Sequence, residues 1–306
     1  MTSAVAVIIP TLNGEKWLDS LLARLKEQTL PAEEILLIDS GSTDRTQQIA
    51  RQHRVRVHEI AAKDFDHGAT RTLAAGLVSG DILVYMTQDA VPEKKDSLEK
   101  LVAPLAEERI AATYGRQLPA RDASIFSEHL RLFNYPARSE IRCWQDRTRY
   151  GFKTIFISNS FAAYRRDVLA AHGFFPSNLL FGEDTLTLAK LIENGYCVAY
   201  VSDACVWHSH NYSLTQDFKR YFDIGVFHVN QREQLMKFGG PGGAGKKYVF
   251  SELSMLAARK KYALLPESVM RNIGKFVAYN LGKRYKMFPR DWARRLSMNH
   301  NWWGGP

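Results

Sequence analysis

The chain has 306 residues, 45% hydrophobic and 24% charged, which is the composition of a globular protein and excludes a disordered or fibrous one. No window holds the roughly 18 consecutive apolar residues of a membrane-spanning helix. The formal net charge is +9, but the segment from Arg232 onward carries 15 basic and four acidic residues, so the remainder is slightly acidic. This basic tail predicts an anionic partner.

The cysteines and the N-terminal residues indicate in which cellular compartment the protein is expected. The three cysteines, Cys143, Cys197 and Cys205, show neither CxxC nor zinc-ligand spacing, and an odd, sparse set is typical of a reducing compartment. An apolar strand begins at Val5 without a basic lead or a long apolar core, so no signal peptide is expected. These features together predict a cytoplasmic protein.

The first 60 residues alternate between strand and helix. Short apolar runs predict buried strands at 4–9 and 35–38, and leucines at helical spacing predict a helix over 15–28. A second helix to about residue 52, with Ser42 or Thr43 as N-cap, and an exposed strand at 55–60 complete a β-α-β-α-β order. That order is the signature of a doubly wound α/β sheet, in which the two polar loops that follow the buried strands lie side by side. The loop residues of interest are Pro10, Thr11, Asn13, Asp39, Ser40 and Ser42.

A third buried strand, at 82–86, is expected at the centre of the sheet, because five apolar residues stand in a row between turn residues. It ends in Thr87, Gln88 and Asp89, which places a carboxylate at the mouth of the sheet, where open α/β sheets bind ligands. Asp89 is suited to a divalent cation, although a strand-terminal Asp can also simply cap a turn.

The helix before this strand begins near His67 and Gly68. A glycine near a helix start allows close backbone approach. Arg71, in the first turn, can reach a phosphate or carboxylate with its fork of donors, or it can be a solvated surface residue.

The second half of the chain is less regular. Residues 117–153 are weakly patterned and predict irregular substrate loops. A strand is expected at 154–162, helices at 166–171 and 185–194, and a strand at 198–201. Glu183 and Asp184 open the second of these helices, and His208 follows the last strand. Acids at a helix start and a histidine at a strand end both have ordinary structural explanations, but with Asp39 and Asp89 they suggest one site.

Taken together, these stretches resemble the inverting, nucleotide-sugar-dependent glycosyltransferases of family 2, which have the GT-A fold. The resemblance covers about residues 3–225. Residues 8–13 and 38–44 look like the family's two nucleotide loops, and 87–89 fall at its Asp-x-Asp metal motif, with Thr87 in place of the first Asp. Glu183-Asp184 matches the family's Glu-Asp motif, and His208 matches a metal-binding histidine of many members.

The resemblance implies roles for these residues. It implies a divalent cofactor, Mg²⁺ or Mn²⁺, held by Asp89 and His208. It makes Asp184 the catalytic base, with Glu183 either orienting the acceptor or acting as base itself. The residues that it places in the donor site are Pro10, Thr11, Asn13, Asp39, Ser40, Ser42, His67, Gly68, Arg71, Thr87 and Gln88.

Residues 65–71 and 87–90 look like those of bacterial rhamnosyltransferases that use dTDP-L-rhamnose. The implied reaction is inverting transfer of L-rhamnose from dTDP-β-L-rhamnose to a saccharide acceptor, lipid-linked, in O-antigen or capsule synthesis. A UDP-hexose-dependent enzyme of the same fold and, because of Thr87, an inactive nucleotide-binding regulator remain alternatives. No nucleic-acid motif is recognised, so nucleic acid is not an expected partner.

The chain is expected to divide into a GT-A domain, 1–230, and a basic, mainly helical extension, 231–306. The glycine-rich run 239–245 predicts a mobile loop or hinge. A helix over 268–288 is amphipathic, with Arg271 and Lys275 among its basic residues. It can lie on an anionic membrane at the inner face of the plasma membrane, or pack on the core or on a second subunit of a homo-oligomer. Its apolar side is predicted to consist of Met270, Ile273, Phe276, Val277, Leu281 and Tyr285.

Overall fold

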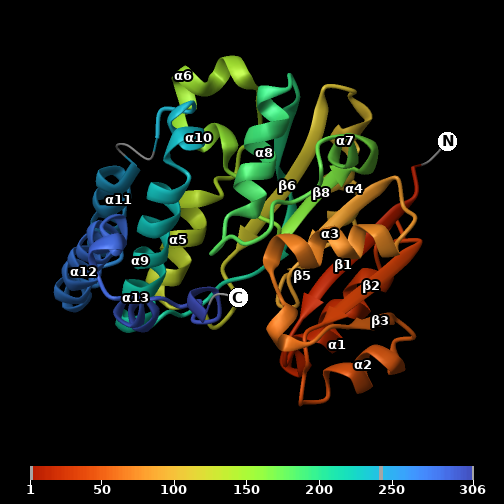
Figure 1. The fold of residues 1–306 in the computed structure, drawn as a ribbon, viewed down its shortest axis with the longest axis horizontal. Helices are drawn as coiled ribbons and strands as arrows, with labels where there is room; N and C mark the ends of the chain where they lie inside the picture. Colours follow the sequence, from red (N-terminus) through yellow and green to blue (C-terminus); the bar gives the residue numbers. More distant parts are fainter. Residues whose placement is uncertain (1–2, 241–243, 305–306) are drawn as a thin grey trace.

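A computed structural model describes residues 3–240 and 244–304 (Figure 1). Within those residues nine strands form one sheet in the order β3-β2-β1-β4-β8-β6-β9-β5, with β7 paired to β9. The strands are β1 (Val5–Thr11), β2 (Glu34–Asp39), β3 (Arg56–Glu59), β4 (Ile82–Met86), β5 (Val91–Pro92), β6 (Ile110–Leu118), β7 (Glu140–Arg142), β8 (Phe161–Arg165) and β9 (Cys197–Trp207).

Helices cover both faces of the sheet. Figure 1 shows α1 and α2 beside β1–β3, and α9, α11, α12 and α13 gathered at the opposite side of the molecule. The helices are α1 (Glu15–Lys26), α2 (Thr46–Gln52), α3 (His67–Leu77), α4 (Ser97–Val102), α5 (Ile125–Asn134), α6 (Arg147–Tyr150), α7 (Arg166–Ala171), α8 (Glu183–Glu193), α9 (Leu214–Asn230), α10 (Arg232–Met236), α11 (Ala244–Ala258), α12 (Leu265–Lys283) and α13 (Arg290–Leu296).

The N-terminal half is the predicted doubly wound unit. β1 pairs in parallel with β2 and β4, and β2 pairs in parallel with β3. Successive residues of β1 point to opposite faces, so Ala6 and Ile8 join a core with α3 and α8, whereas Val7 and Ile9 join one with α1, α2 and α4. All five residues of β4 are buried because both faces of the sheet are covered.

The strand predicted at 154–162 is misplaced. The chain forms a 3₁₀ turn at Gly151–Ile155, and β8 begins only at Phe161, antiparallel to β4 and β6. The buried guanidinium of Arg142 donates to the carbonyl oxygens of Lys153 and, at 2.8 Å, Phe156. These carbonyls are therefore satisfied by a side chain instead of a neighbouring strand.

The segment 117–153, expected to be irregular, is largely ordered into helix and strand. It contains the end of β6, then α5, β7 and α6. Ser124 caps α5 by accepting a hydrogen bond from the backbone N–H of Ser127 at 3.2 Å. The helix and strand pattern of this segment was hard to recognise in the sequence, because a residue such as Arg142, which is expected at the surface, is buried in specific contacts.

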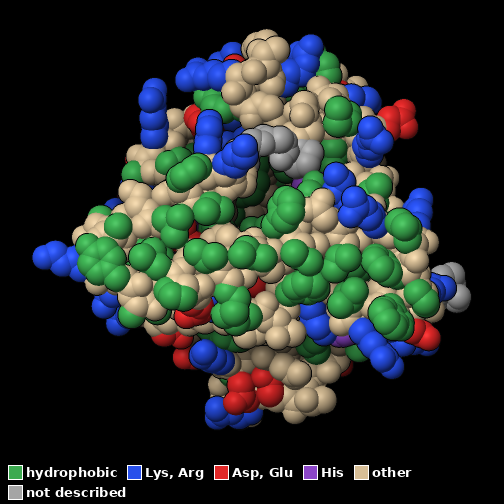
Figure 2. Space-filling view, turned by 90° about the vertical axis from the view of Figure 1, so that its left-hand side faces the viewer, with side chains coloured by type: hydrophobic (Ala, Val, Ile, Leu, Met, Phe, Trp, Pro, Cys, Tyr) green, Lys and Arg blue, Asp and Glu red, His purple; other side chains and the backbone are tan. Residues whose placement is uncertain are grey.

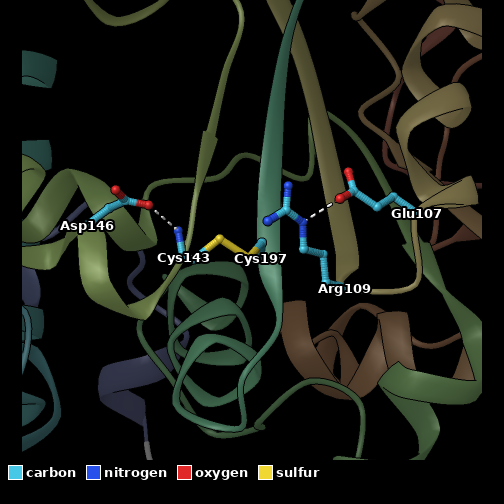
Figure 3. Close-up of a disulfide and its surroundings, with 5 residues drawn as sticks. All are labelled: Glu107, Arg109, Cys143, Asp146 and Cys197. Carbon is cyan, nitrogen blue, oxygen red and sulfur yellow. Dashed lines mark hydrogen bonds and ion pairs between the residues drawn. A yellow bond between two sulfur atoms is a disulfide. The ribbon is translucent and has the colours of Figure 1, made fainter.

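Cys143 and Cys197 form a disulfide that ties the segment after β7 to the start of β9 (Figure 3). Their Cα atoms lie 4.4 Å apart, and the Asp146 carboxylate accepts a hydrogen bond from the Cys143 backbone N–H at 2.9 Å. Cys205 is free and buried. The odd, sparse set of cysteines predicted a reducing compartment, where disulfides are rare. The Cys143–Cys197 bond departs from that prediction.

The tail is mainly helical, as predicted, and packs on α9. Within the described residues no helix is both long and apolar enough to cross a membrane. Part of the predicted glycine-rich hinge, residues 241–243, lies outside the described residues. The boundary at residue 230 stays a prediction, because α9 and the tail share one buried cluster. That cluster consists of Leu180, Phe222, Val226, Ala278, Ala293 and Trp303.

Candidate active site

The two loops predicted to bind a nucleotide lie side by side and are joined by hydrogen bonds. Thr11 and Asp39, the last residues of β1 and β2, are paired in register. Ser42 Oγ accepts from the Asn13 backbone N–H at 2.8 Å, and Asn13 Oδ1 accepts from the backbone N–H of Thr43 at 2.9 Å. Because Ser42 and Thr43 serve this contact, the prediction that either caps α2 is wrong, and α2 begins at Thr46.

Asp39 is fully buried at the base of these loops. Its carboxylate accepts hydrogen bonds from the Ser42 hydroxyl, from the Ser42 backbone N–H at 3.3 Å and from Gln47 Nε2 at 2.8 Å. The Ser40 hydroxyl donates to the carbonyl of Thr11 at 3.0 Å, and Pro10 is half-buried within β1. Asp39 is thus held rigidly where the sheet ends, and Gln47, which sequence reasoning missed, helps to hold it.

Gln88 and Thr87 lie in the turn after β4, beside the first loop. The Gln88 side chain accepts from the Leu12 backbone N–H at 2.9 Å and donates to the Leu12 carbonyl at 3.0 Å. The backbone N–H of half-buried Thr87 donates to the Ser160 carbonyl at 3.3 Å. Gln88 therefore fixes the shape of the first loop, and its amide is occupied by that loop.

Asp89 lies in a group of three side chains that can hold a metal ion, together with His208 and His210. Asp89 Oδ1 is 3.4 Å from His208 Nε2, and Oδ2 is 3.7 Å from His210 Nε2. One ligand atom from each residue falls within 4.8 Å of the others. Burial alone would raise the pKa of Asp89, but the hydrogen bond and charge of His208, with His210, hold it well below its usual range. The carboxylate is therefore ionised and ready to bind a cation.

His208 is oriented for this role by Gln117. His208 Nδ1 lies 2.9 Å from Gln117 Oε1, and this contact orients the ring so that Nε2 faces Asp89. Gln117 is itself fixed by Arg131, whose guanidinium donates to the same oxygen at 2.6 Å. The residues fit a divalent cation, and a cavity of about 360 Å³ opens beside Asp89, His208 and His210.

Arg71 and Glu183 form a buried ion pair. Arg71 Nη1 lies 2.8 Å from Glu183 Oε1, and each side chain is only 6% exposed. Burial alone would raise the pKa of Glu183, but the Arg71 charge, with His67, lowers it. Arg71, expected to reach a phosphate, is thus committed to Glu183, and Glu183 is held as a carboxylate with its charge satisfied.

The pKa of Asp184, the residue after Glu183, is shifted in the opposite direction. Burial and then the charge of Glu183 raise the pKa of Asp184 to about 7, against the partial lowering by Arg71. Its oxygens accept from the backbone N–H of Thr185 at 2.7 Å and of Asn159 at 3.3 Å. A helix start favours an ionised carboxylate, but burial and then the charge of Glu183 bring the pKa of Asp184 near neutrality, where a general base works best.

One short segment joins the metal group to Asp184. Asn159 contacts Asp184 through its backbone and Glu183 through its side-chain amide at 3.4 Å. The preceding Ser158 accepts a hydrogen bond from Gln117 at 3.1 Å, and Gln117 holds His208. A chain of contacts through Gln117, Ser158 and Asn159 therefore links the cation ligands to the candidate base.

His67 and Gly68 open α3 on the other side of Arg71. Burial lowers the pKa of His67, whose Nδ1 lies 3.4 Å from Arg71 Nη1. A Cβ on Gly68 would meet the Pro176 carbonyl oxygen at 1.8 Å, so the close approach predicted for this glycine is to the segment that leads into α8. Gly68 thereby brings Arg71 and Glu183 together across 112 residues of sequence.

A large cavity of about 1190 Å³ lies between this region and the tail. It is lined by His67 and Phe181, which neighbour the buried ion pair, by Arg220 and Asp223 of α9, and by Trp302. Burial raises the pKa of Asp223 to about 6. Asp89 and Asp184 do not line this cavity, so the cation ligands and the candidate base lie outside it.

Sequence reasoning missed the residues that support the site. These are Gln47, Gln117, Ser158, Asn159 and His210. His210 had a usable signal, since it stands two residues after His208. The others are ordinary polar residues whose role depends on long-range contacts, and no local pattern marks them.

Comparison with known proteins gives the same family as the motifs. A family model described as glycosyl transferase family 2 matches residues 6–173. The chain is 39% identical over 301 residues to the O-antigen chain rhamnosyltransferase RfbN of Salmonella typhimurium, covering 98% of this chain and 96% of that one. It is also 39% identical over 300 residues to the O-antigen chain rhamnosyltransferase WbaN of Salmonella anatum, covering 97% and 95%.

Solved structures agree on the fold. A mannosyltransferase, PcManGT from Pyrobaculum calidifontis in complex with GDP-Man and Mn²⁺, superposes with a TM-score of 0.61 at 17% identity, covering 99% of this chain and 85% of that one. TarS of Staphylococcus aureus, residues 1–349, gives a TM-score of 0.56 at 19% identity, covering 96% and 83%. These likenesses confirm the expected GT-A fold. With the matched family model and the two near full-length relatives, they establish that the chain belongs to glycosyl transferase family 2.

Proposed function

We propose that the protein is an inverting rhamnosyltransferase that moves L-rhamnose from dTDP-β-L-rhamnose to a lipid-linked saccharide during O-antigen synthesis. Two near full-length relatives at 39% identity carry the name O-antigen chain rhamnosyltransferase. The observation that carries the mechanism is a carboxyl with a pKa of about 7, Asp184, linked through Asn159, Ser158 and Gln117 to a group of cation ligands.

The donor lies over the two loops at the ends of β1 and β2. The loop that carries the exposed Asn13 faces the nucleoside, while the buried Asp39, with Ser42 and Gln88, holds the two loops in shape. Asp89, His208 and His210 hold a divalent cation, which when bound neutralises charge on the leaving diphosphate. Two imidazoles beside one carboxylate suit Mn²⁺ better than Mg²⁺, because Mg²⁺ prefers an all-oxygen shell.

Asp184 takes the proton from the acceptor hydroxyl as that oxygen attacks the anomeric carbon. General base catalysis contributes about 10²–10⁴-fold when the pKa lies near the working pH. Arg71 and Glu183 act as positioning residues, since their ion pair fixes the start of α8. Burial and then the Glu183 charge raise the pKa of the neighbouring Asp184, whereas the Arg71 charge lowers it. A single displacement inverts the anomeric centre, so the product is an α-L-rhamnoside.

The acceptor saccharide occupies the cavity of about 1190 Å³ between the start of α3, α9 and the tail, and its reacting hydroxyl extends past Phe181 to Asp184, outside the cavity. Its lining suits a sugar, because aromatic faces such as Phe181 and Trp302 can cover the apolar side of a pyranose ring while Asp223 and Arg220 meet hydroxyl groups. In this arrangement residues 1–230 bind the donor and the tail completes the acceptor site. The enzyme works at the cytoplasmic face of the plasma membrane, where a lipid-linked acceptor is presented.

The test is donor screening by nucleotide release, followed by product analysis. The purified chain is incubated with Mn²⁺, a lipid-linked saccharide acceptor, and either dTDP-L-rhamnose or UDP-hexoses. Turnover with dTDP-L-rhamnose and an α-linked rhamnose by NMR support the proposal. Turnover with a UDP-hexose alone would instead identify a different transferase of the same fold. Donor binding without turnover in the presence of metal would identify an inactive nucleotide-binding protein.

A further inference from the structure

Helix α12 presents its most hydrophobic side to solvent. Phe276 is 70% exposed, Ile273 59% and Met270 53%, and Val269 and Val277 are exposed beside them. These five side chains, which we call the α12 ridge, repeat at the spacing of one helix face. Figure 2 shows a row of hydrophobic side chains crossing this face of the molecule. A continuous exposed apolar row of this kind marks an interaction surface.

The orientation of α12 is fixed by the polar residues on its inner side. Arg271 donates to the Asp217 carboxylate at 2.6 Å, and Lys275 is buried with its ammonium 3.9 Å from the same residue. Arg271 and Lys275, two of the basic residues that make this helix amphipathic, therefore face the protein instead of solvent. Turning the ridge inward would separate Arg271 and Lys275 from the Asp217 carboxylate. Breaking a buried ion pair destabilises a protein, so these contacts fix the outward direction of the ridge.

The helix is also held close to α9 by small residues. A Cβ on Gly282 would meet the Phe222 carbonyl oxygen at 2.0 Å, and one on Gly225 would meet the Tyr279 carbonyl oxygen at 2.3 Å. The two helices therefore pack backbone to backbone, and α12 has no freedom to roll. The other side of α9 contributes Asp223 to the large cavity.

Cations surround the ridge. Lys260 and Lys261 are exposed just before α12, and Lys283, Arg284 and Lys286 are exposed at its C-terminal end. Among the described residues from 244 onward, Asp291 is an exposed acid, Glu267 is half-buried and paired with Arg271, and Glu252 is buried. Figure 2 shows Lys and Arg side chains around the hydrophobic row.

We infer that the α12 ridge and its surrounding cations form a docking surface for an anionic lipid bilayer. The ridge side chains enter the boundary between headgroups and acyl chains, and the cations bind lipid phosphates. A second copy of the chain fits less well, because an isologous contact would bring the same cations against one another. The inference stands apart from the proposed reaction, since the surface does not include the donor loops, the cation ligands or Asp184. It places the membrane one helix away from the cavity assigned to the acceptor.

The experiment is co-sedimentation of the full chain with sucrose-loaded vesicles, without donor or acceptor. Vesicles of equal parts phosphatidylglycerol and phosphatidylcholine are compared with pure phosphatidylcholine, at low and high salt. The wild type is expected to bind the anionic vesicles at least tenfold more tightly, and less so at high salt. The double variant Ile273→Ser/Phe276→Ser is expected to weaken that binding at least tenfold. Its fold should persist, because both side chains lie in solvent.

The matched control is Leu73→Ser, which removes an apolar side chain 43% exposed on helix α3 and should bind like wild type. The variant Lys283→Gln/Arg284→Gln should lose the preference for anionic lipid while keeping its circular dichroism spectrum. Failure of the wild type to bind, or equal binding by the ridge variant, would overturn the inference. A wild-type dimer in analytical ultracentrifugation that the ridge variant abolishes, with no vesicle binding, would instead make the ridge a self-association surface.

Discussion

Replacing Glu183 by glutamine tests whether Glu183 only positions and tunes the neighbouring Asp184 or is itself the catalytic base. Glu183 is 6% exposed and paired with Arg71 at 2.8 Å, so the change leaves a buried guanidinium without its counter-charge. Breaking a buried ion pair from one side costs about 3–5 kcal/mol. A typical domain has about 5–15 kcal/mol of stability, so Glu183→Gln should fold but unfold at a clearly lower urea concentration.

The same change should alter the pH dependence of the reaction. The pKa of Asp184 is about 7 because of burial first and the Glu183 charge second, and Arg71 opposes both. Without the Glu183 charge, the Asp184 pKa should fall on the order of one unit, which is about 1.4 kcal/mol. The base must be deprotonated to act, so activity rises with pH through this pKa. In the variant that rise should move about one unit toward acid.

The assay is the ratio kcat/KM over pH 5 to 9, with urea denaturation of the same samples. Because Glu183→Gln can be too unstable to assay, the double variant Arg71→Gln/Glu183→Gln serves as a second test. It leaves no unpaired charge and should recover much of the lost stability. If a stably folded Glu183→Gln protein loses a hundredfold or more of its activity at every pH, Glu183 is itself the base and the reasoning fails.

Three further predictions concern the rest of the site and the fold. Asp89→Ala should remove most turnover and abolish metal-dependent donor binding, whereas near-normal activity of the wild type in EDTA would refute the cation site. Asp39→Ala should raise the donor KM more than it lowers kcat, because Asp39 anchors the loops that hold the nucleoside; an unchanged donor KM would count against this. Reduction of the Cys143–Cys197 bond, which spans 54 residues, should lower the free energy of unfolding by about 4 kcal/mol, measured in urea with and without dithiothreitol. An identical midpoint in the two conditions would argue that the bond does not form in solution.

The N-terminal half of the fold could be predicted because its signals are local. Apolar runs at 4–9, 35–38 and 82–86 are buried on both faces, and each ends in polar residues at the same edge of the sheet. The later strands could not be placed in this way. Ile155 and Ile157 are apolar and buried, but the carbonyls of Lys153 and Phe156 beside them accept from Arg142, which comes from a different segment.

The sequence could identify the charged residues of the candidate site, but it could identify only some of the contacts that these residues make. Asp89, Asp184 and His208 stand at the ends of regular elements, where sequence reasoning can find them. The partner of Arg71 lies 112 residues away in Glu183, so its burial could not be read from α3 alone. The same limit applies to α12. Arg271 pairs with Asp217 of α9 and therefore faces the protein, and this contact fixes which side of α12 faces solvent.

Single-turnover transfer by Asp184→Asn, measured beside donor binding by calorimetry, tests the central claim most directly. Asparagine keeps the shape of the side chain and removes its basicity. Transfer is expected to fall by about two orders of magnitude or more while the donor Kd stays close to that of the wild type. Wild-type turnover in this variant, or a loss of donor binding with chemistry intact, would contradict the assignment of Asp184 as the base.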